Sequence, residues 1–213
     1  MLTVVTPAAS TRLVTIAAAR AELRAGGDVT DAAIGALIDQ ASAAMAGYRG
    51  AGFGRRMLRE TLRGCWGRPA LMLSAYPVAQ LVSLTAGGAA MTADAGFELD
   101  PTTGLIYRLS GGCRSPWAAG TVVVQYQDGW VLPLDPVQGQ SVPPASDLPA
   151  DLTRACLTLV SGLSAASGRD PSLRSESVAG VGSTTWAEAG PDAAGLPPQV
   201  AATLARYLTP VMA

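Results

Sequence analysis

Hydrophobic residues recur with the period of an α-helix in four segments near the two ends of the chain. Residues 28–50 carry the clearest apolar stripe, which predicts a helix with one buried face: Ile34, Leu37, Ile38, Ala41, Met45 and Tyr48. Thr30 precedes this stripe as a candidate N-cap, and Gly47 and Gly50 lie where it ends. Shorter helices are predicted over 14–27 (N-cap Thr15, stop at Gly26–Gly27), over 148–167, and over 196–208, which starts with Pro197 and Pro198.

The middle of the chain changes to short strands separated by turns. Residues 121–130 (TVVVQYQDGW) give the strongest strand pattern, and residues 69–91 predict further strands with a hairpin turn at Gly87–Gly88. Residues 97–109 predict two strands around an Asp-Pro-Thr-Thr-Gly turn. Residues 56–66 fit either a helix or a strand. The strand alternative puts Leu58 and Leu62 on one face, and Arg59, Thr61 and Arg63 on the other.

These elements predict an α+β fold with a small helical core of three to four helices, an inserted antiparallel β-rich module and an extended C-terminal segment. We expect N-terminal helices of the core in 1–55 and the β module in 56–130. Residues 131–149 form a connection that holds five of the 15 prolines. Residues 150–213 supply a core helix, an extended strap and a C-terminal helix.

The strap covers residues 169–186 (RDPSLRSESVAGVGSTTW), between the last two predicted helices. Its apolar positions argue against a plain linker, and we expect an extended strand from Glu176 to Trp186 with bends at Gly180 and Gly182. Such a strand would pair with a neighbouring subunit or another protein through backbone hydrogen bonds. The candidate partner-contact residues are Arg174, Ser175, Glu176, Ser177, Val178, Val181 and Trp186. Among the four tryptophans, Trp186 is the expected interface anchor, and Trp66, Trp117 and Trp130 are expected to fill the core at module edges.

Composition removes most of the usual catalytic chemistry. The sequence has no His, no Lys and no Asn, so it lacks the common neutral-pH base and the Schiff-base lysine. Its three cysteines (Cys65, Cys113 and Cys156) are widely spaced, which argues against a disulfide framework or a zinc site and favours a reducing compartment. Ser164 lies in a near match to a nucleophile elbow, but within a predicted helix and without a histidine. We expect no enzyme, no cofactor and no metal site.

Charge is nearly balanced overall but uneven along the chain. The formal net charge is −1, with +4 in residues 1–68 and −5 in the remainder. Such asymmetry suits a protein that stacks between two different neighbours. Arg55, Arg56, Arg59 and Arg63 form a basic run that could contact phosphate or an acidic partner, and a solvated strand face is an equally good interpretation. No apolar run is long enough to span a membrane.

The order of these segments resembles a known family. LVTIAAARAELR, DAAIGALIDQASAAMAGYRG, DPTTGLIYRL, VVVQYQDGW, PADLTRACLTLV and the strap follow one another as in the head–tail connectors of tailed bacteriophages, also called adaptor or head-completion proteins. The sequence is most similar to the adaptor of a gene transfer agent, a phage-derived particle that packages cellular DNA. The likeness covers roughly residues 12–208. The larger β section and the proline-rich connection depart from the shorter family pattern.

The resemblance implies a structural role in the neck of a virion or virus-like particle assembled in the bacterial cytoplasm. It implies a ring of this chain, usually of twelve copies, between the portal protein and a downstream connector (stopper) protein. Double-stranded DNA would pass through without sequence-specific binding, and the strap would reach toward the portal. Two alternatives remain: a β module that binds a host-surface sugar or protein through Trp117 and Trp130, and a carboxylate-based hydrolase using Asp94, Glu98 or Asp100.

Overall fold

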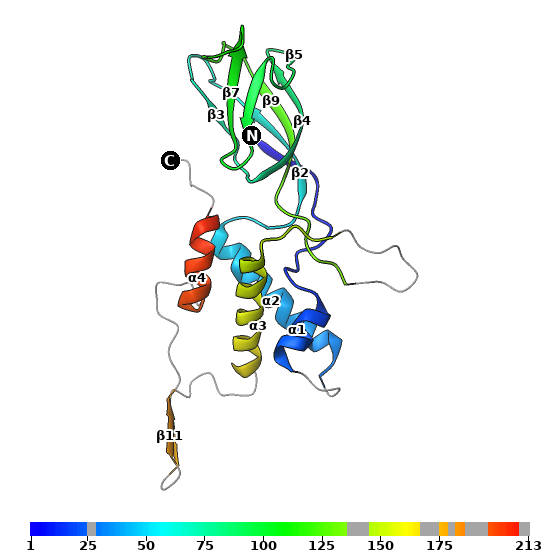
Figure 1. Cartoon of the computed structure of the whole chain (residues 1–213), viewed down its shortest axis with the longest axis vertical. Helices are drawn as coiled ribbons and strands as arrows, with labels where there is room; N and C mark the ends of the chain where they lie inside the picture. Colours follow the sequence, from blue (N-terminus) through cyan, green and yellow to red (C-terminus); the bar gives the residue numbers. More distant parts are fainter. Residues whose placement is uncertain (25–28, 136–144, 167–174, 179–181, 186–195, 209–213) are drawn as a thin grey trace, which may run out of the picture. The chain divides into compact units, whose positions relative to one another are not determined.

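The chain folds into two compact units, each built from two separate stretches of the sequence. The computed structural model describes residues 1–24, 29–135, 145–166, 175–178, 182–185 and 196–208. The β unit comprises Met1–Ser10 and Phe53–Val131, and the helical unit comprises Thr11–Gly52 and Leu132–Ala213. Helices and antiparallel sheets together confirm the predicted α+β class (Figure 1). The first ten residues belong to the β unit, whereas the sequence pattern grouped them with the helices.

Among its described residues the helical unit contains four α-helices: α1 (Ile16–Leu23), α2 (Asp31–Arg49), α3 (Ala150–Ala166) and α4 (Pro198–Leu204), the last followed by the 3₁₀ turn η2 (Ala205–Tyr207). α2 packs against α3 along its length, and both contact α1 and α4 (Figure 1). Segments separated by more than a hundred residues therefore share one core.

Capping residues set the helix ends much as the sequence indicated. The hydroxyls of Thr15 and Thr30 each accept a hydrogen bond, 3.2 Å long, from a backbone N–H of the first helical turn. Gly50 ends α2 in the left-handed conformation, at φ +77°. Gly47, the other candidate stop, lies inside α2. α1 ends earlier than predicted, because Arg24 adopts the left-handed conformation at φ +48°.

The buried faces of the helices carry the predicted apolar residues and two unexpected polar ones. Ile34, Ile38, Ala41 and Met45 on α2, and Leu152, Ala155, Cys156, Leu159 and Val160 on α3, are buried. Ser42 is also buried, and its hydroxyl accepts a 3.2 Å hydrogen bond from the Leu13 backbone N–H. Arg49 is 4% exposed, and its guanidinium donates to the carbonyl oxygens of Tyr207 (3.0 Å) and Gly52. This arginine ties the end of α2 to the turn after α4.

The β unit contains a five-stranded antiparallel sheet in the order β1-β2-β9-β4-β5. These strands are β1 (Leu2–Thr6), β2 (Arg56–Leu62), β9 (Val122–Asp128), β4 (Val78–Ala86) and β5 (Ala89–Ala90). A second sheet pairs β3 (Leu71–Met72), β7 (Leu105–Ser110) and β6 (Phe97–Asp100), with β8 (Cys113–Ser115) also on β7. The β4–β5 hairpin at Gly87–Gly88 and the β6–β7 hairpin agree with the sequence pattern.

The segment that fitted either a helix or a strand, residues 56–66, contains strand β2. Leu58 is fully buried and Arg59 is exposed, as the strand alternative requires. β2 pairs with β9 over its whole length, and β1 pairs with its other edge. β1 had no counterpart in the sequence pattern, because every one of its five residues is exposed and no alternation marks it. Its pairing partner lies more than fifty residues away.

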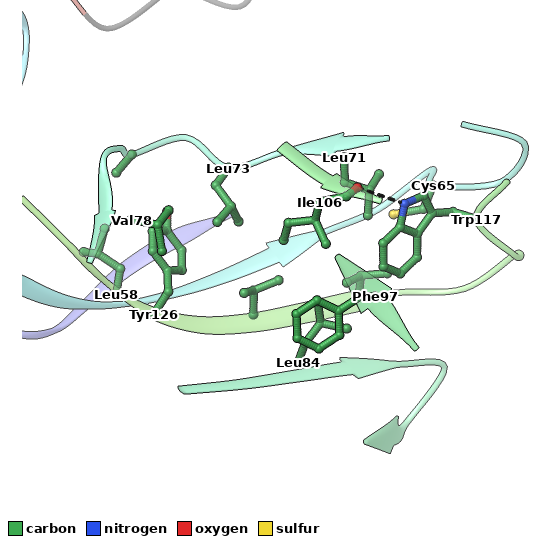
Figure 2. Close-up of a cluster of buried hydrophobic side chains, with 13 residues drawn as sticks. Leu58, Cys65, Leu71, Leu73, Val78, Leu84, Phe97, Ile106, Trp117 and Tyr126 are labelled. Carbon is green, nitrogen blue, oxygen red and sulfur yellow. Dashed lines mark hydrogen bonds between the residues drawn. The ribbon is translucent and has the colours of Figure 1, made fainter. Parts of the chain in front are cut away.

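An apolar cluster fills the β unit and contains residues from both of its sheets (Figure 2). Leu58, Val78 and Tyr126 lie toward one end of this cluster, and Cys65 and Trp117 lie toward the other. Glu60 is also buried at 2% exposure. Its carboxylate accepts hydrogen bonds from the Ser74 backbone N–H (3.0 Å), the Ser74 hydroxyl (2.5 Å) and the Tyr126 hydroxyl (2.8 Å). Three donors satisfy this buried carboxylate.

Candidate partner-contact surfaces

Within the strap, the structure describes two paired strands in place of the single strand predicted from Glu176 to Trp186. β10 (Ser175–Val178) and β11 (Gly182–Thr185) pair antiparallel, with Ser175 opposite Thr185 and Val178 opposite Gly182. Gly182 is therefore a paired strand residue and not a bend point, because it lies in register with Val178. Arg174, Gly180, Val181 and Trp186 lie outside the described residues. A two-stranded sheet keeps unpaired backbone groups along its two outer edges, so it can accept a further strand.

The basic run divides into internal and exposed members. The Arg56 guanidinium donates to the Asp128 carboxylate directly opposite on β9, at 3.2 and 2.5 Å, and Asp128 is buried. This carboxylate raises the pKa of Arg56. Arg55 is half-buried, and its backbone N–H donates to the Trp130 carbonyl. Arg59 and Arg63 are exposed. The structure thus leaves two of the four side chains in a position to meet a partner.

The three acidic candidates do not form an acid–base pair. Glu98 binds Arg114 through two hydrogen bonds of 2.9 Å, and this contact lowers the pKa of Glu98. Asp100 accepts hydrogen bonds from Thr103 and from the Thr102 backbone, which lower the pKa of Asp100. Both groups are therefore held ionised as parts of the β6–β7 region. Asp94 lies in a turn with a left-handed backbone.

The tryptophans differ sharply in exposure. Trp117 is 2% exposed and its indole N–H donates to the Ile106 carbonyl at 3.4 Å (Figure 2). Trp130 packs against Phe53 with ring centroids 6.2 Å apart. Trp66, in contrast, is 79% exposed. The sequence pattern favoured Trp186 as the interface anchor and treated Trp66 as core filling. The glycines and arginines around Trp66 indicate a tight polar turn, but they do not show which way the tryptophan side chain points.

Three free cysteines and a cavity also lie among the described residues. Cys156 lies on the buried face of α3, as predicted, and burial raises the pKa of its thiol to about 11. Cys65 is also buried, whereas Cys113 is exposed, and all three are free thiols. A cavity of about 330 Å³ opens in the β unit between Gly87, Arg108, Trp117 and Gly120. Within the described ranges no cluster of three metal-ligating side chains occurs, and no helix is long and apolar enough to cross a membrane.

The fold defined by these two units occurs in chains of gene transfer agent particles. No protein-family model and no curated protein matches the chain. Solved structures match it over its whole length, which confirms the likeness to gene transfer agent neck components that the sequence indicated.

Three such structures are chains from gene transfer agent (GTA) particles. One is from the virion of a native particle (TM-score 0.56, 22% identity), one from the neck of an empty particle computed with C6 symmetry (0.54, 23%), and one from the neck of a native particle computed with C12 symmetry (0.51, 24%). Each match covers 100% of this chain and 97% of the other. At this level of identity the likeness establishes a common fold.

Proposed function

We propose that the protein is a non-enzymatic structural component of the neck of a gene-transfer-agent-like particle, the adaptor between the portal and a downstream connector. The observation that carries this proposal is the full-length match, in both units, to chains from gene transfer agent necks and virions. A likeness confined to one unit would be compatible with a shared module alone. A likeness that spans both units supports the same architectural role.

The adaptor acts as a closed ring of identical copies, which we propose to be twelve. Two of the similar neck structures were computed with C6 and C12 symmetry, which supports a cyclic assembly. A ring of this kind is built from head-to-tail contacts, so each copy needs two different complementary surfaces. The β unit has seven arginines against five acids (+2) and the helical unit eight against eleven (−3), so the two units carry opposite net charge for such contacts.

Duplex DNA passes through this ring without sequence-specific binding. Affinity for DNA rises steeply with the number of phosphates that basic side chains neutralise. The net charge is −1, and Arg56 of the basic run is already paired with Asp128. Arg59 and Arg63 are left to contact phosphate or an acidic partner, which favours passage over retention of the DNA.

The strap joins the ring to the portal or to a neighbouring copy. Its hairpin offers two edges for backbone hydrogen bonding, which supports strand addition by a partner. In this proposal the contact residues are those expected from the sequence, Arg174, Ser175, Glu176, Ser177, Val178, Val181 and Trp186. The complete neck would assemble in the bacterial cytoplasm.

Electron microscopy of the purified protein mixed with its purified portal tests the adaptor role. The expected result is a ring of additional density on the portal with twelvefold symmetry. A variant whose residues 175–185 are replaced by a Gly/Ser linker of equal length should lose this ring and keep the circular dichroism of the helical unit. Absence of binding by the wild-type protein at both low and high ionic strength would refute the adaptor role.

The sugar-binding and hydrolase alternatives gain no support from the site geometry. Trp117 is buried, so its ring offers no free face for stacking on a sugar, and the half-buried Trp130 ring packs against Phe53. Glu98 and Asp100 are engaged by Arg114 and by the Thr102–Thr103 turn. These contacts explain both carboxylates as structural groups.

A further inference from the structure

Residues 63–68 (RGCWGR), here called the Trp66 loop, hold a large aromatic side chain in solvent. Trp66 is 79% exposed, whereas its neighbour Cys65 is 1% exposed and belongs to the apolar cluster of the β unit. Figure 2 shows Cys65 beside Trp117 at one end of that cluster. The loop therefore has one residue anchored in the core and the next directed away from it.

Hydrogen bonds fix the backbone of this loop. The Gly67 N–H donates to the Trp117 carbonyl and the Trp117 N–H donates to the Arg68 carbonyl, both at 2.9 Å. The Arg68 N–H donates to the Cys65 carbonyl at 3.1 Å, closing the turn. Gly64 and Gly67 have φ values of +67° and +73°, which L side chains rarely adopt. Because the backbone is already ordered, little conformational entropy is lost when Trp66 is buried by a partner.

The composition of the loop indicates the kind of partner. Tryptophan and arginine are the residues most enriched among those that dominate protein–protein binding energies. Arg63 and Arg68 flank Trp66 and are exposed, and neither side chain forms a hydrogen bond or ion pair with a residue of the described ranges. The complementary surface is an apolar pocket with carboxylates at its rim.

The cavity in the β unit of a second copy fits that description poorly. This cavity, at about 330 Å³, is large enough for an indole ring. Arg108 lines this cavity among otherwise apolar residues, so it would face Arg63 and Arg68 with charge of the same sign. Duplex DNA fits poorly as well, because two arginines neutralise few phosphates and the bases of a duplex are already stacked.

We propose that the Trp66 loop is the anchor by which the β unit binds the downstream connector, a different protein that supplies the carboxylate-rimmed pocket. This inference rests on the proposed adaptor function. A ring in a stack contacts two different neighbours, and the strap of the helical unit is assigned to the portal or the adjacent copy. The β unit is a separate compact body with an ordered, exposed anchor, so we assign it to the other neighbour.

Binding of the purified downstream connector to the portal-bound ring tests the proposal. Trp66→Ala should weaken connector binding by at least about tenfold, and Trp66→Phe should retain part of the affinity. The double variant Arg63→Glu/Arg68→Glu should slow association, with a smaller effect at high salt. Val82→Ala serves as the matched control, because Val82 is an exposed apolar residue of the same unit, 48% exposed.

Separate measurements distinguish failure of this inference from failure of the adaptor role. Each variant should form the ring on the portal as the wild type does and keep its thermal unfolding midpoint, since Trp66 is not part of the core. Equal connector binding by wild type and Trp66→Ala refutes the inference and leaves the adaptor role intact. Loss of portal binding alone, or Trp66-dependent binding to duplex DNA in place of the connector, also refutes it. If the wild type binds neither neck protein, the adaptor role fails and the inference fails with it.

Discussion

The buried hydrogen bond between Tyr126 and Glu60 makes Tyr126→Phe an informative perturbation of the β unit. The substitution removes the hydroxyl and keeps the ring that fills the core. Tyr126 is fully buried on β9, and its hydroxyl donates to the Glu60 carboxylate at 2.8 Å. The variant therefore loses one hydrogen bond to a buried carboxylate and leaves one lone pair of that carboxylate without a donor.

These losses set the expected magnitude. A hydrogen bond to a charged group contributes about 1.5–3 kcal/mol, and an unsatisfied buried group adds about 1 kcal/mol or more. We expect Tyr126→Phe to lower the free energy of unfolding of the β unit by about 3 kcal/mol. With a urea dependence of about 1–3 kcal/mol per molar, the midpoint should fall by about 1–3 M.

Urea unfolding followed by tryptophan fluorescence measures this change, because buried Trp117 reports on the β unit. Tyr107→Phe is the matched control. Tyr107 is partly exposed on β7, and its hydroxyl bonds to no residue within the described ranges. The control should stay within about 0.5 kcal/mol of the wild type.

Alkaline pH gives an independent signature. Burial and the nearby Glu60 carboxylate raise the pKa of Tyr126 in the folded protein. Above about pH 10 the unfolded tyrosine ionises while the folded one stays protonated, so the free energy of unfolding falls as pH rises. The sequence contains no lysine to titrate in the same range. The advantage of the wild type over Tyr126→Phe should therefore shrink above about pH 10.

Two results would refute this account of the β core. One is a decrease of less than about 0.5 kcal/mol in the free energy of unfolding of Tyr126→Phe at neutral pH, which would mean that water replaces the hydroxyl without loss of stability. The other is a difference in the free energy of unfolding between wild type and Tyr126→Phe that stays constant from about pH 9 to about pH 11.

Three further predictions concern other buried groups. Asp128→Asn should lower the free energy of unfolding by about 3 kcal/mol, because it leaves the paired arginine of β2 without its carboxylate; thermal unfolding measures this, and an unchanged midpoint would contradict it. Gly129→Ala should cost more than about 2 kcal/mol, since its Cβ would lie 2.6 Å from a backbone carbonyl oxygen, whereas Gly112→Ala, at φ +78° against φ +77° but in open space, should cost about 1 kcal/mol. Cys113 should react with iodoacetamide at pH 8 in the folded protein and Cys156 should not, because Cys156 is buried and its thiol pKa is raised to about 11; mass spectrometry after digestion decides this, and rapid modification of Cys156 would show that the helical core opens.

Local sequence patterns predicted the elements whose boundaries depend on neighbouring residues. Thr15, Thr30 and Gly50 cap helices where the sequence indicated, since a cap is recognised by its own side chain or its missing one. The strand at Val122–Asp128 alternates between buried and half-buried residues, and this period of two residues can be recognised from the sequence alone.

Candidate site residues were less predictable than elements. The strap residues were selected from their apolar positions and from the family resemblance, and in the structure Ser175–Val178 pairs with Gly182–Thr185 of the same chain. Trp66 was taken as core filling because tryptophan is usually buried, and the exposure of a single side chain depends on which distant segments pack around it. Gly64 and Gly67 hinted at a tight turn without showing which way the side chain between them points.

The sequence by itself determined the class of fold, the helices with their caps, the principal strands and the absence of histidine and lysine chemistry. These properties follow from residue identity and from periods of two to four residues. Only the tertiary structure decided that β1 joins the β unit, that Glu60 and Arg49 are buried, and that Trp66 is presented to solvent. Each of these depends on contacts between segments that are distant in sequence, and their free energies are gained only when the whole core has formed.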